Sequence, residues 1–194
     1  MLQFITQPEN RYSVPEQCQM VIEGGCQWIQ LRTQPDSDTE MRSLLPELVS
    51  LCKETETILV IENRPEIAEE YGLHGVHVTL GSGIDPVELR EQLGPHAIIG
   101  AEVDKAEVAV RLAGADIDYL TLPKDMSSEQ RRSIIDALKE NGKVIPVVIE
   151  NDFTVDNVKK AIDEGAAGVC TGKNIIAADN PVEYVSEMIK VLNS

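Results

Sequence analysis

Short apolar segments alternate with longer amphipathic segments along the whole chain, and polar residues follow almost every apolar segment. The apolar segments are typical of buried strands, whereas the segments between them repeat their apolar residues at helical spacing. Eight segments predict strands, at residues 1–5, 28–32, 58–61, 75–78, 97–100, 119–122, 144–149 and 167–171. An open doubly wound sheet usually needs only about five or six strands. The pattern therefore predicts a single (β/α)₈ TIM barrel over residues 1–194.

Residues suited to the first turn of a helix precede the amphipathic segments. These candidate starting or capping residues are Pro15, Asp36, Ser37, Asp38, Pro65, Asp85, Asp104, Ser127, Thr154 and Asn180. No linker or low-complexity segment interrupts the series, and 194 residues are within the size of one domain. We therefore expect one domain with a single core.

The chain is strongly acidic. It has 17 basic and 33 acidic side chains, which give a formal net charge of −16 at pH 7. Such a charge repels nucleic acid and anionic membrane surfaces, so neither is expected as a partner. A small anionic or phosphorylated ligand remains compatible, because a few local cations can bind it. No apolar run approaches the roughly 20 residues of a membrane span.

The four cysteines are Cys18, Cys26, Cys52 and Cys170, and none forms a C-x-x-C pair. They are expected to be buried and inert, because they lie at predicted helix or strand positions. The chain starts directly on a predicted strand rather than on a signal-like segment. We therefore expect a cytoplasmic protein with reduced thiols. The sequence leaves the formation of a homo-oligomer open.

Polar residues follow the strands at the end where barrels of this type carry their chemistry. The candidate acids or bases are Glu62, Glu102 and Glu150, and no catalytic role is assigned among them. The candidate ligand-binding residues at these positions are Arg32, Asn63, Arg64, His77, Lys124, Asn151 and Lys173. His77 and Trp28 also have a simpler interpretation as packing residues of the barrel.

Three segments carry longer motifs. Residues 23–32 read EGGCQWIQLR, residues 59–68 read LVIENRPEIA, and residues 72–78 read GLHGVHV. Shorter matching pieces follow in the same order at residues 98–100, 118–119, 145–148 and 164–169. Together they resemble the thiamine phosphate synthase family, whose superfamily also includes a thiazole tautomerase. The resemblance covers essentially the whole chain and adds Gln30 to the candidate ligand-binding residues.

The resemblance implies a reaction in which a pyrimidine pyrophosphate loses its pyrophosphate and a thiazole phosphate nitrogen takes its place, assisted by Mg²⁺. Most of the residues that the resemblance assigns to this reaction are replaced here, although Arg32 is retained. Gln34 stands in place of a lysine, and Asn63 and Ser82 stand in place of two metal-binding carboxylates. Glu102 replaces a phosphate-contacting hydroxyl, and residues 151–152 replace a phosphate-binding Gly-Gly. The loop after the sixth strand is also shorter than in the family.

These simultaneous replacements predict that the synthase reaction is absent or very weak, and they predict no metal and no other cofactor. The first hypothesis is a barrel of thiamine metabolism with an altered site, where Arg32 and Lys173 bind a small anion and a glutamate transfers a proton. The alternatives are a catalytically silent binding or regulatory relative, and a weakly active synthase. The sequence leaves open whether the chain is an enzyme.

The charged strand ends also have a purely structural interpretation, because ion pairs between them would fill a former pocket. The candidate pairs are Arg32 with Glu62, and Lys124 or Lys173 with Glu102 or Glu150.

Overall fold

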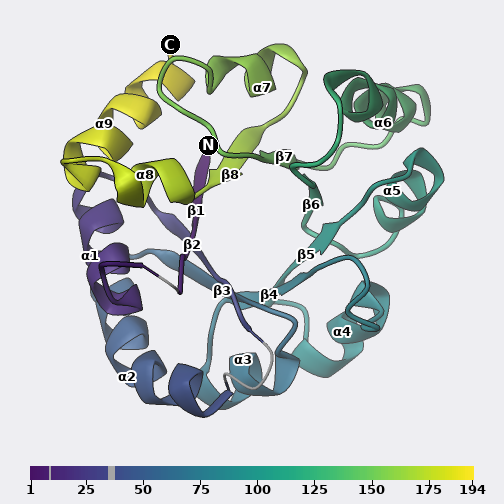
Figure 1. Ribbon diagram of the computed structural model, residues 1–194. Helices are drawn as coiled ribbons and strands as arrows, with labels where there is room; N and C mark the ends of the chain where they lie inside the picture. The colour runs from purple at the N-terminus through teal and green to yellow at the C-terminus, as the bar shows by residue number, and fades with distance from the viewer. Residues whose placement is uncertain (9, 35–37) are drawn as a thin grey trace.

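Eight parallel strands close into a barrel in the computed structural model, which describes residues 1–8, 10–34 and 38–194 (Figure 1). Each strand pairs with the next one along the chain, and β8 closes the barrel against β1. The strands are β1 Leu2–Ile5, β2 Trp28–Leu31, β3 Ile58–Glu62, β4 Gly75–Val78, β5 Ile98–Glu102, β6 Tyr119–Leu122, β7 Val147–Glu150 and β8 Gly168–Thr171. The predicted (β/α)₈ barrel is confirmed.

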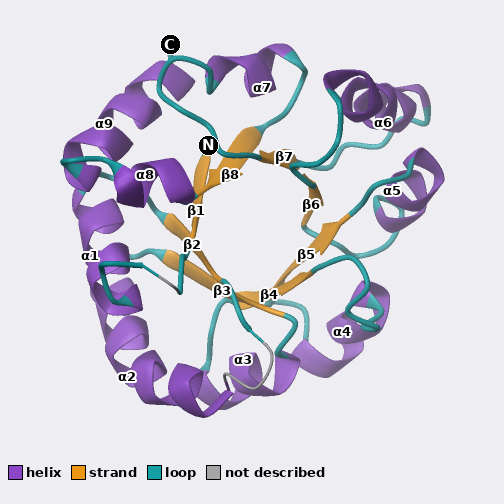
Figure 2. Cartoon of the chain, viewed as in Figure 1, coloured by secondary structure: helices purple, strands orange, loops and turns teal. Residues whose placement is uncertain are grey.

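Helices form a ring outside the strands (Figure 2). They are α1 Val14–Glu23, α2 Asp38–Glu54, α3 Pro65–Tyr71, α4 Pro86–Leu93, α5 Ala106–Leu112, α6 Ser128–Glu140, α7 Lys159–Asp163, α8 Lys173–Ala177 and α9 Pro181–Leu192. The short α8 between β8 and α9 was not predicted. Among the described residues, no helix is both long and apolar enough to cross a membrane.

Several helices begin at the capping residues that the sequence predicts. The side chains of Asp85, Ser127 and Asn180 each accept a hydrogen bond from a backbone N–H in the first turn of α4, α6 and α9. These bonds satisfy N–H groups that have no partner within the helix. The predicted caps Asp36 and Ser37 lie outside the described residues.

Two predicted caps are wrong. Lys105, not Asp104, precedes α5, and it makes no capping hydrogen bond with its side chain. Thr154 begins a turn rather than α7, since its carbonyl accepts from the N–H of Val158, the residue immediately before that helix. Asp104 and Thr154 are good cap types, but residues nearer each helix take the capping position.

The seventh strand begins three residues later than predicted. Val144 is 101% exposed, and β7 starts at residue 147. Pairing with β6 begins at the Pro146 carbonyl, which accepts from the Leu120 N–H at 3.0 Å. Proline lacks an N–H group, so the residues before it do not continue the strand ladder.

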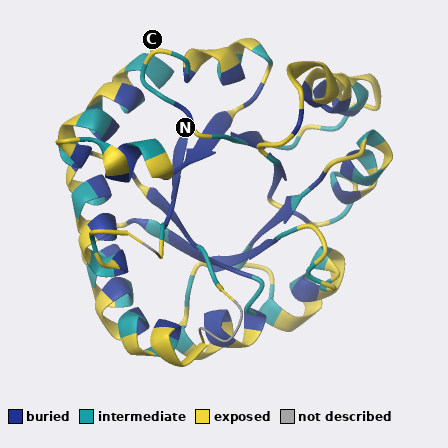
Figure 3. Ribbon diagram, viewed as in Figure 1, coloured by how far each residue is buried: buried dark blue, intermediate teal, exposed yellow. Residues whose placement is uncertain are grey.

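The strands are buried on both faces (Figure 3), which explains their nearly continuous apolar sequences. Their outer faces pack against the helices in the main core. Inside the barrel, the rings of Trp28 and Tyr119 meet edge to face with centroids 4.7 Å apart. His77 lies beside them, with its Nδ1 3.0 Å from the Tyr119 hydroxyl. The packing roles predicted for Trp28 and His77 are confirmed.

All four cysteines are free and buried, as the sequence predicts. Burial raises the pKa of the Cys26 and Cys52 thiols to about 11. A thiol with such a pKa is protonated at neutral pH and is a poor nucleophile. The cysteines are therefore packing residues.

Candidate functional site

Arg32 lies among the charged residues at the carboxyl ends of the strands, which we call the mouth of the barrel. It follows β2, and its Nη2 donates a hydrogen bond to Oε1 of Glu150, the last residue of β7, at 2.9 Å. Its Nε lies 3.8 Å from Oε1 of Glu62, the last residue of β3. The predicted pair of Arg32 with Glu62 is confirmed, although Glu150 is the nearer partner.

Glu62 is the most firmly held carboxylate of the mouth. Its Oε1 accepts from Gln30 Nε2 at 2.8 Å, and its Oε2 accepts from the Thr33 N–H at 3.2 Å. Burial raises the pKa of Glu62, while the hydrogen bond from Gln30 and the charge of Arg32 partly oppose this shift. A buried carboxyl with a raised pKa is a candidate acid or base, but its hydrogen bonds also fix its position.

Glu102, the last residue of β5, lies at the same end of the barrel as Glu62 and Glu150. Its Oε2 accepts from the Leu80 N–H at 2.9 Å. Burial raises the pKa of Glu102, and the nearby Glu150 carboxylate raises it further. Glu102 is therefore a second carboxyl of the mouth that is suited to proton exchange.

A small cavity of about 80 Å³ opens between the mouth residues that follow the first, second and last three strands. Four predicted ligand-binding residues line it, namely Arg32, Lys124, Asn151 and Lys173. Thr171 also lines it, and among the described residues the buried Thr171 Oγ1 has no hydrogen-bond partner. Cations that line a small cavity suit a small anion. Pockets for drug-sized ligands are larger, about 300–1,000 Å³.

The lysines of the mouth do not form the predicted ion pairs. Within the described ranges, no ion pair involves Lys124 or Lys173. Glu150 is instead paired with Arg32, and Glu102 is bonded to backbone. The Arg32 guanidinium reaches Glu150 and Glu62 from the end of β2, while Lys124 and Lys173 line the small cavity.

The other four predicted ligand-binding residues lie outside this cavity. Gln30 is bonded to Glu62, and His77 is buried inside the barrel, where burial lowers its pKa to about 3. The Arg64 Nε donates to Asp38 Oδ1 at 2.6 Å, at the start of α2. Asn63 faces Thr79 rather than the cavity. Barrel closure alone does not bring these side chains together.

The residues present do not fit the Mg²⁺ ion that the family resemblance implies. Asn63 Oδ1 accepts from the Thr79 N–H at 2.9 Å, and Asn63 Nδ2 donates to Thr79 Oγ1 at 2.7 Å. Ser82 Oγ accepts from the Ile84 N–H at 3.3 Å. No group of three or more acidic, histidine or cysteine side chains among the described residues is placed to hold a metal ion. Mg²⁺ prefers carboxylate oxygens, which are missing at both positions.

Asn174 has a role that the sequence analysis did not assign. Its Nδ2, in α8, donates to the backbone oxygens of Asp152 at 2.8 Å and Phe153 at 3.2 Å. This bond ties the loop after β7 to the helix after β8, which places Asn151 and Lys173 on one cavity. The strand-end pattern shows that Asn174 is near the mouth but cannot show that it anchors a backbone.

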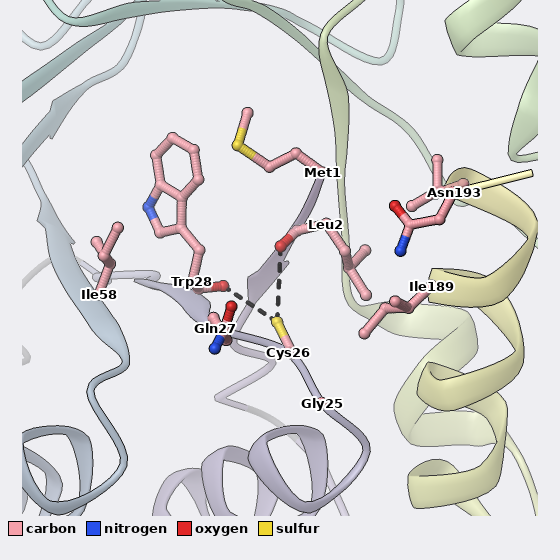
Figure 4. Close-up of a pocket in the computed structure, with 10 residues that line it drawn as sticks. Met1, Leu2, Gly25, Cys26, Gln27, Trp28, Ile58, Ile189 and Asn193 are labelled. Atoms are coloured by element: carbon pink, nitrogen blue, oxygen red, sulfur yellow. Dashed lines mark hydrogen bonds between the residues drawn. The ribbon is translucent and has the colours of Figure 1, made fainter.

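A larger cavity of about 360 Å³ lies at the amino-terminal ends of the first strands (Figure 4). It lies among Leu2, Trp28, Ile58 and the end of α9, and Cys26 Sγ contacts the backbone oxygens of Leu2 and Trp28 there. Its lining side chains are uncharged. Barrels carry their chemistry at the opposite end, so the charged mouth is the candidate site.

The fold and the mouth define a (β/α)₈-barrel protein whose candidate site lies at the carboxyl ends of the strands. The model of the thiamine monophosphate synthase family matches residues 2–175. The chain therefore belongs to this family.

Named relatives and solved structures agree with this assignment. Thiamine-phosphate synthase of Bacteroides fragilis is 32% identical over 203 residues, which cover 98% of this chain and 98% of that protein. The protein of the same name from Bacteroides thetaiotaomicron is 33% identical over 205 residues, covering 99% and 96%. The structure of thiamine phosphate pyrophosphorylase from Pyrococcus furiosus superimposes with a TM-score of 0.86 at 23% identity, covering 99% of this chain and 95% of that one. The latter likeness concerns the fold.

Proposed function

We propose that this member of the family binds a small anion of about phosphate size at the mouth of the barrel and does not form thiamine phosphate. The observation that carries the proposal is the cavity lined by Arg32, Lys124 and Lys173. Three cations around a space of about 80 Å³ favour a compact anion over a pyrimidine and a thiazole bound side by side.

The local charge supports anion binding despite the acidic chain. Three cations and two carboxylates, Glu150 and Asp152, line the cavity, so its formal charge is +3 − 2 = +1. The whole chain carries −16. A locally positive cavity in a negative protein selects small anions that reach it, while the overall field repels large polyanions.

The changed synthase positions support the loss of the family reaction. Asn63 is committed to Thr79 through both atoms of its amide, and it is not a carboxylate. Gln34 is neutral where the family resemblance implies a lysine. Loss of one such group costs a catalyst about 2–4 kcal/mol of transition-state stabilisation, and here several are changed together.

One observation favours the silent regulatory relative as a second candidate. Arg32 is already paired with Glu150 and Glu62 within the mouth. If these pairs fully occupied the site, the mouth would bind no ligand. Binding of inorganic phosphate separates the two candidates.

The reaction is tested by incubating the protein with hydroxymethylpyrimidine pyrophosphate, thiazole phosphate and Mg²⁺, and by measuring thiamine phosphate. The Bacteroides fragilis synthase is the positive control, and a mixture without protein is the blank. We expect no product above the blank. Product formation above the blank would identify a weakly active synthase and overturn this part of the proposal.

Anion binding is tested by calorimetric titration with inorganic phosphate. We expect weak binding that Lys173→Gln reduces. Lys190→Gln is the matched control, since Lys190 lies in the last turn of α9 on the outer ring and should leave binding unchanged. Absence of phosphate binding, or an equal effect of the two variants, would support the silent relative instead.

A further inference from the structure

We infer that Glu150 acts as a built-in anionic competitor in the mouth, holding the Arg32 guanidinium that a bound anion would otherwise take. This inference rests on the proposed anion site. Its consequence is that the affinity of the mouth for phosphate is set by the Arg32–Glu150 pair.

The two carboxylates that contact Arg32 differ in how firmly they are held. Glu62 accepts from Gln30 and from the Thr33 backbone, in addition to its longer contact with Arg32. Glu150 has one described hydrogen-bond partner for its side chain, Arg32, among residues 1–8, 10–34 and 38–194. Glu150 is also the more exposed, at 18% of its side chain against 8% for Glu62. The Glu150 carboxylate can therefore be displaced from Arg32 more easily than the Glu62 carboxylate.

The pair lies at the wall of the cavity that is also lined by Lys124 and Lys173, which form no ion pair with any described residue. Arg32 and Glu150 both line it, together with these two lysines. An anion in this space would meet the two lysines directly, but it would find the third cation already bonded at 2.9 Å. Like charges repel, so the anion and the Glu150 carboxylate compete for the same guanidinium. An anion therefore gains the whole Arg32 guanidinium only when the Arg32–Glu150 bond opens.

Asp152 offers a charge-matched comparison. It lines the same cavity and carries the same charge as Glu150. No ion pair of Asp152 occurs in the described part of the chain, and its backbone rather than its carboxylate is anchored by Asn174. Removal of either negative charge changes the cavity from +1 to +2, but only removal of Glu150 also frees Arg32.

The experiment titrates inorganic phosphate into the wild type, Glu150→Gln, Asp152→Asn, and the double variant Arg32→Gln with Glu150→Gln, at one fixed ionic strength. We expect Glu150→Gln to bind phosphate at least about tenfold more tightly than the wild type, and Asp152→Asn less than about threefold more tightly. The double variant should lose the increase in phosphate affinity seen in Glu150→Gln, because that increase depends on the Arg32 guanidinium. Thermal unfolding of each variant confirms that it is folded.

The outcomes separate this inference from the proposed function. Equal gains in Glu150→Gln and Asp152→Asn would assign the effect to general charge and overturn the competitor role. Phosphate binding that Glu150→Gln leaves unchanged would overturn the inference and leave the anion site standing. A lack of binding by every variant, including Glu150→Gln, would overturn both.

Discussion

The ring of Tyr119 packs directly against Gly100 inside the barrel, where a side chain on residue 100 would otherwise lie. A Cβ atom placed on Gly100 would lie 2.1 Å from Cζ of Tyr119. Gly100 is in β5, and Tyr119 is its direct partner at the start of β6. The Tyr119 ring is 1% exposed, and its hydroxyl is bonded to Gln3 and His77. Gly100 is therefore required for space rather than for backbone conformation.

We predict that Gly100→Ala lowers the free energy of unfolding by about 1–3 kcal/mol, since the held ring cannot move aside. Chemical denaturation measures this loss. Gly114→Ala is the matched control, because its added Cβ would meet the movable end of Lys143 at 2.9 Å. We expect that control to change stability by less than about 0.5 kcal/mol. Similar losses in both variants would contradict the explanation.

Arg131 and Glu164 form a buried ion pair between α6 and the loop before β8. Arg131 Nε lies 2.7 Å from Glu164 Oε2, and its Nη1 donates to the Met126 carbonyl at 2.6 Å. We predict that Arg131→Ala lowers the free energy of unfolding by about 3–5 kcal/mol, because it leaves a buried carboxylate without its partner. Arg132→Ala, one residue away on the exposed face, should have little effect in the same urea titration. A comparable loss there would refute this account.

Much of the fold is predictable because strands and helices have different periods. The barrel closure and most helix starts, such as Ser127 and Asn180, follow from that pattern and from capping chemistry. The start of β7 is less predictable, since Val144 and Ile145 resemble strand residues while Pro146 interrupts the ladder. Local propensity cannot show where pairing with a distant strand begins.

The candidate site is only partly predictable for a related reason. A barrel brings all strand ends to one rim, so Arg32, Lys124 and Lys173 are placed near one another by topology alone. The direction of each side chain depends on its neighbours. Arg64 turns toward Asp38, and Arg32 takes Glu150 as its nearer partner, which no spacing in the sequence indicates.

Asn63 adopts a left-handed backbone conformation beside the mouth, with φ of 51°. Because glycine tolerates this conformation and alanine does not, we predict that Asn63→Gly is more stable than Asn63→Ala by about 1–2 kcal/mol. Both variants lose the bonds to Thr79, so the difference isolates the backbone. The control is Ala137→Gly in helix α6, where glycine should instead lower stability by about 1 kcal/mol. Equal stability of the two Asn63 variants in thermal denaturation would disprove the strain.

His77 should make the protein less stable as the pH falls. Burial lowers its folded-state pKa to about 3, whereas an unfolded histidine titrates near about 6.5. Below about pH 6.5 the unfolded state binds a proton at this histidine, whereas the folded state does not. The wild type therefore loses stability as the pH decreases. We predict that the difference in free energy of unfolding between the wild type and His77→Gln shrinks by about 2 kcal/mol from pH 8 to pH 5.

The pH 8 measurement serves as the control for His77→Gln, because histidine is then neutral in both states and the difference reports packing and hydrogen bonding alone. The loss of the bond to the Tyr119 hydroxyl belongs to that constant part. A difference that stays the same from pH 8 to pH 5 would mean that His77 accepts a proton within the folded barrel. Nitrogen chemical shifts of the His77 ring would then change over the same range, whereas we expect them to stay constant.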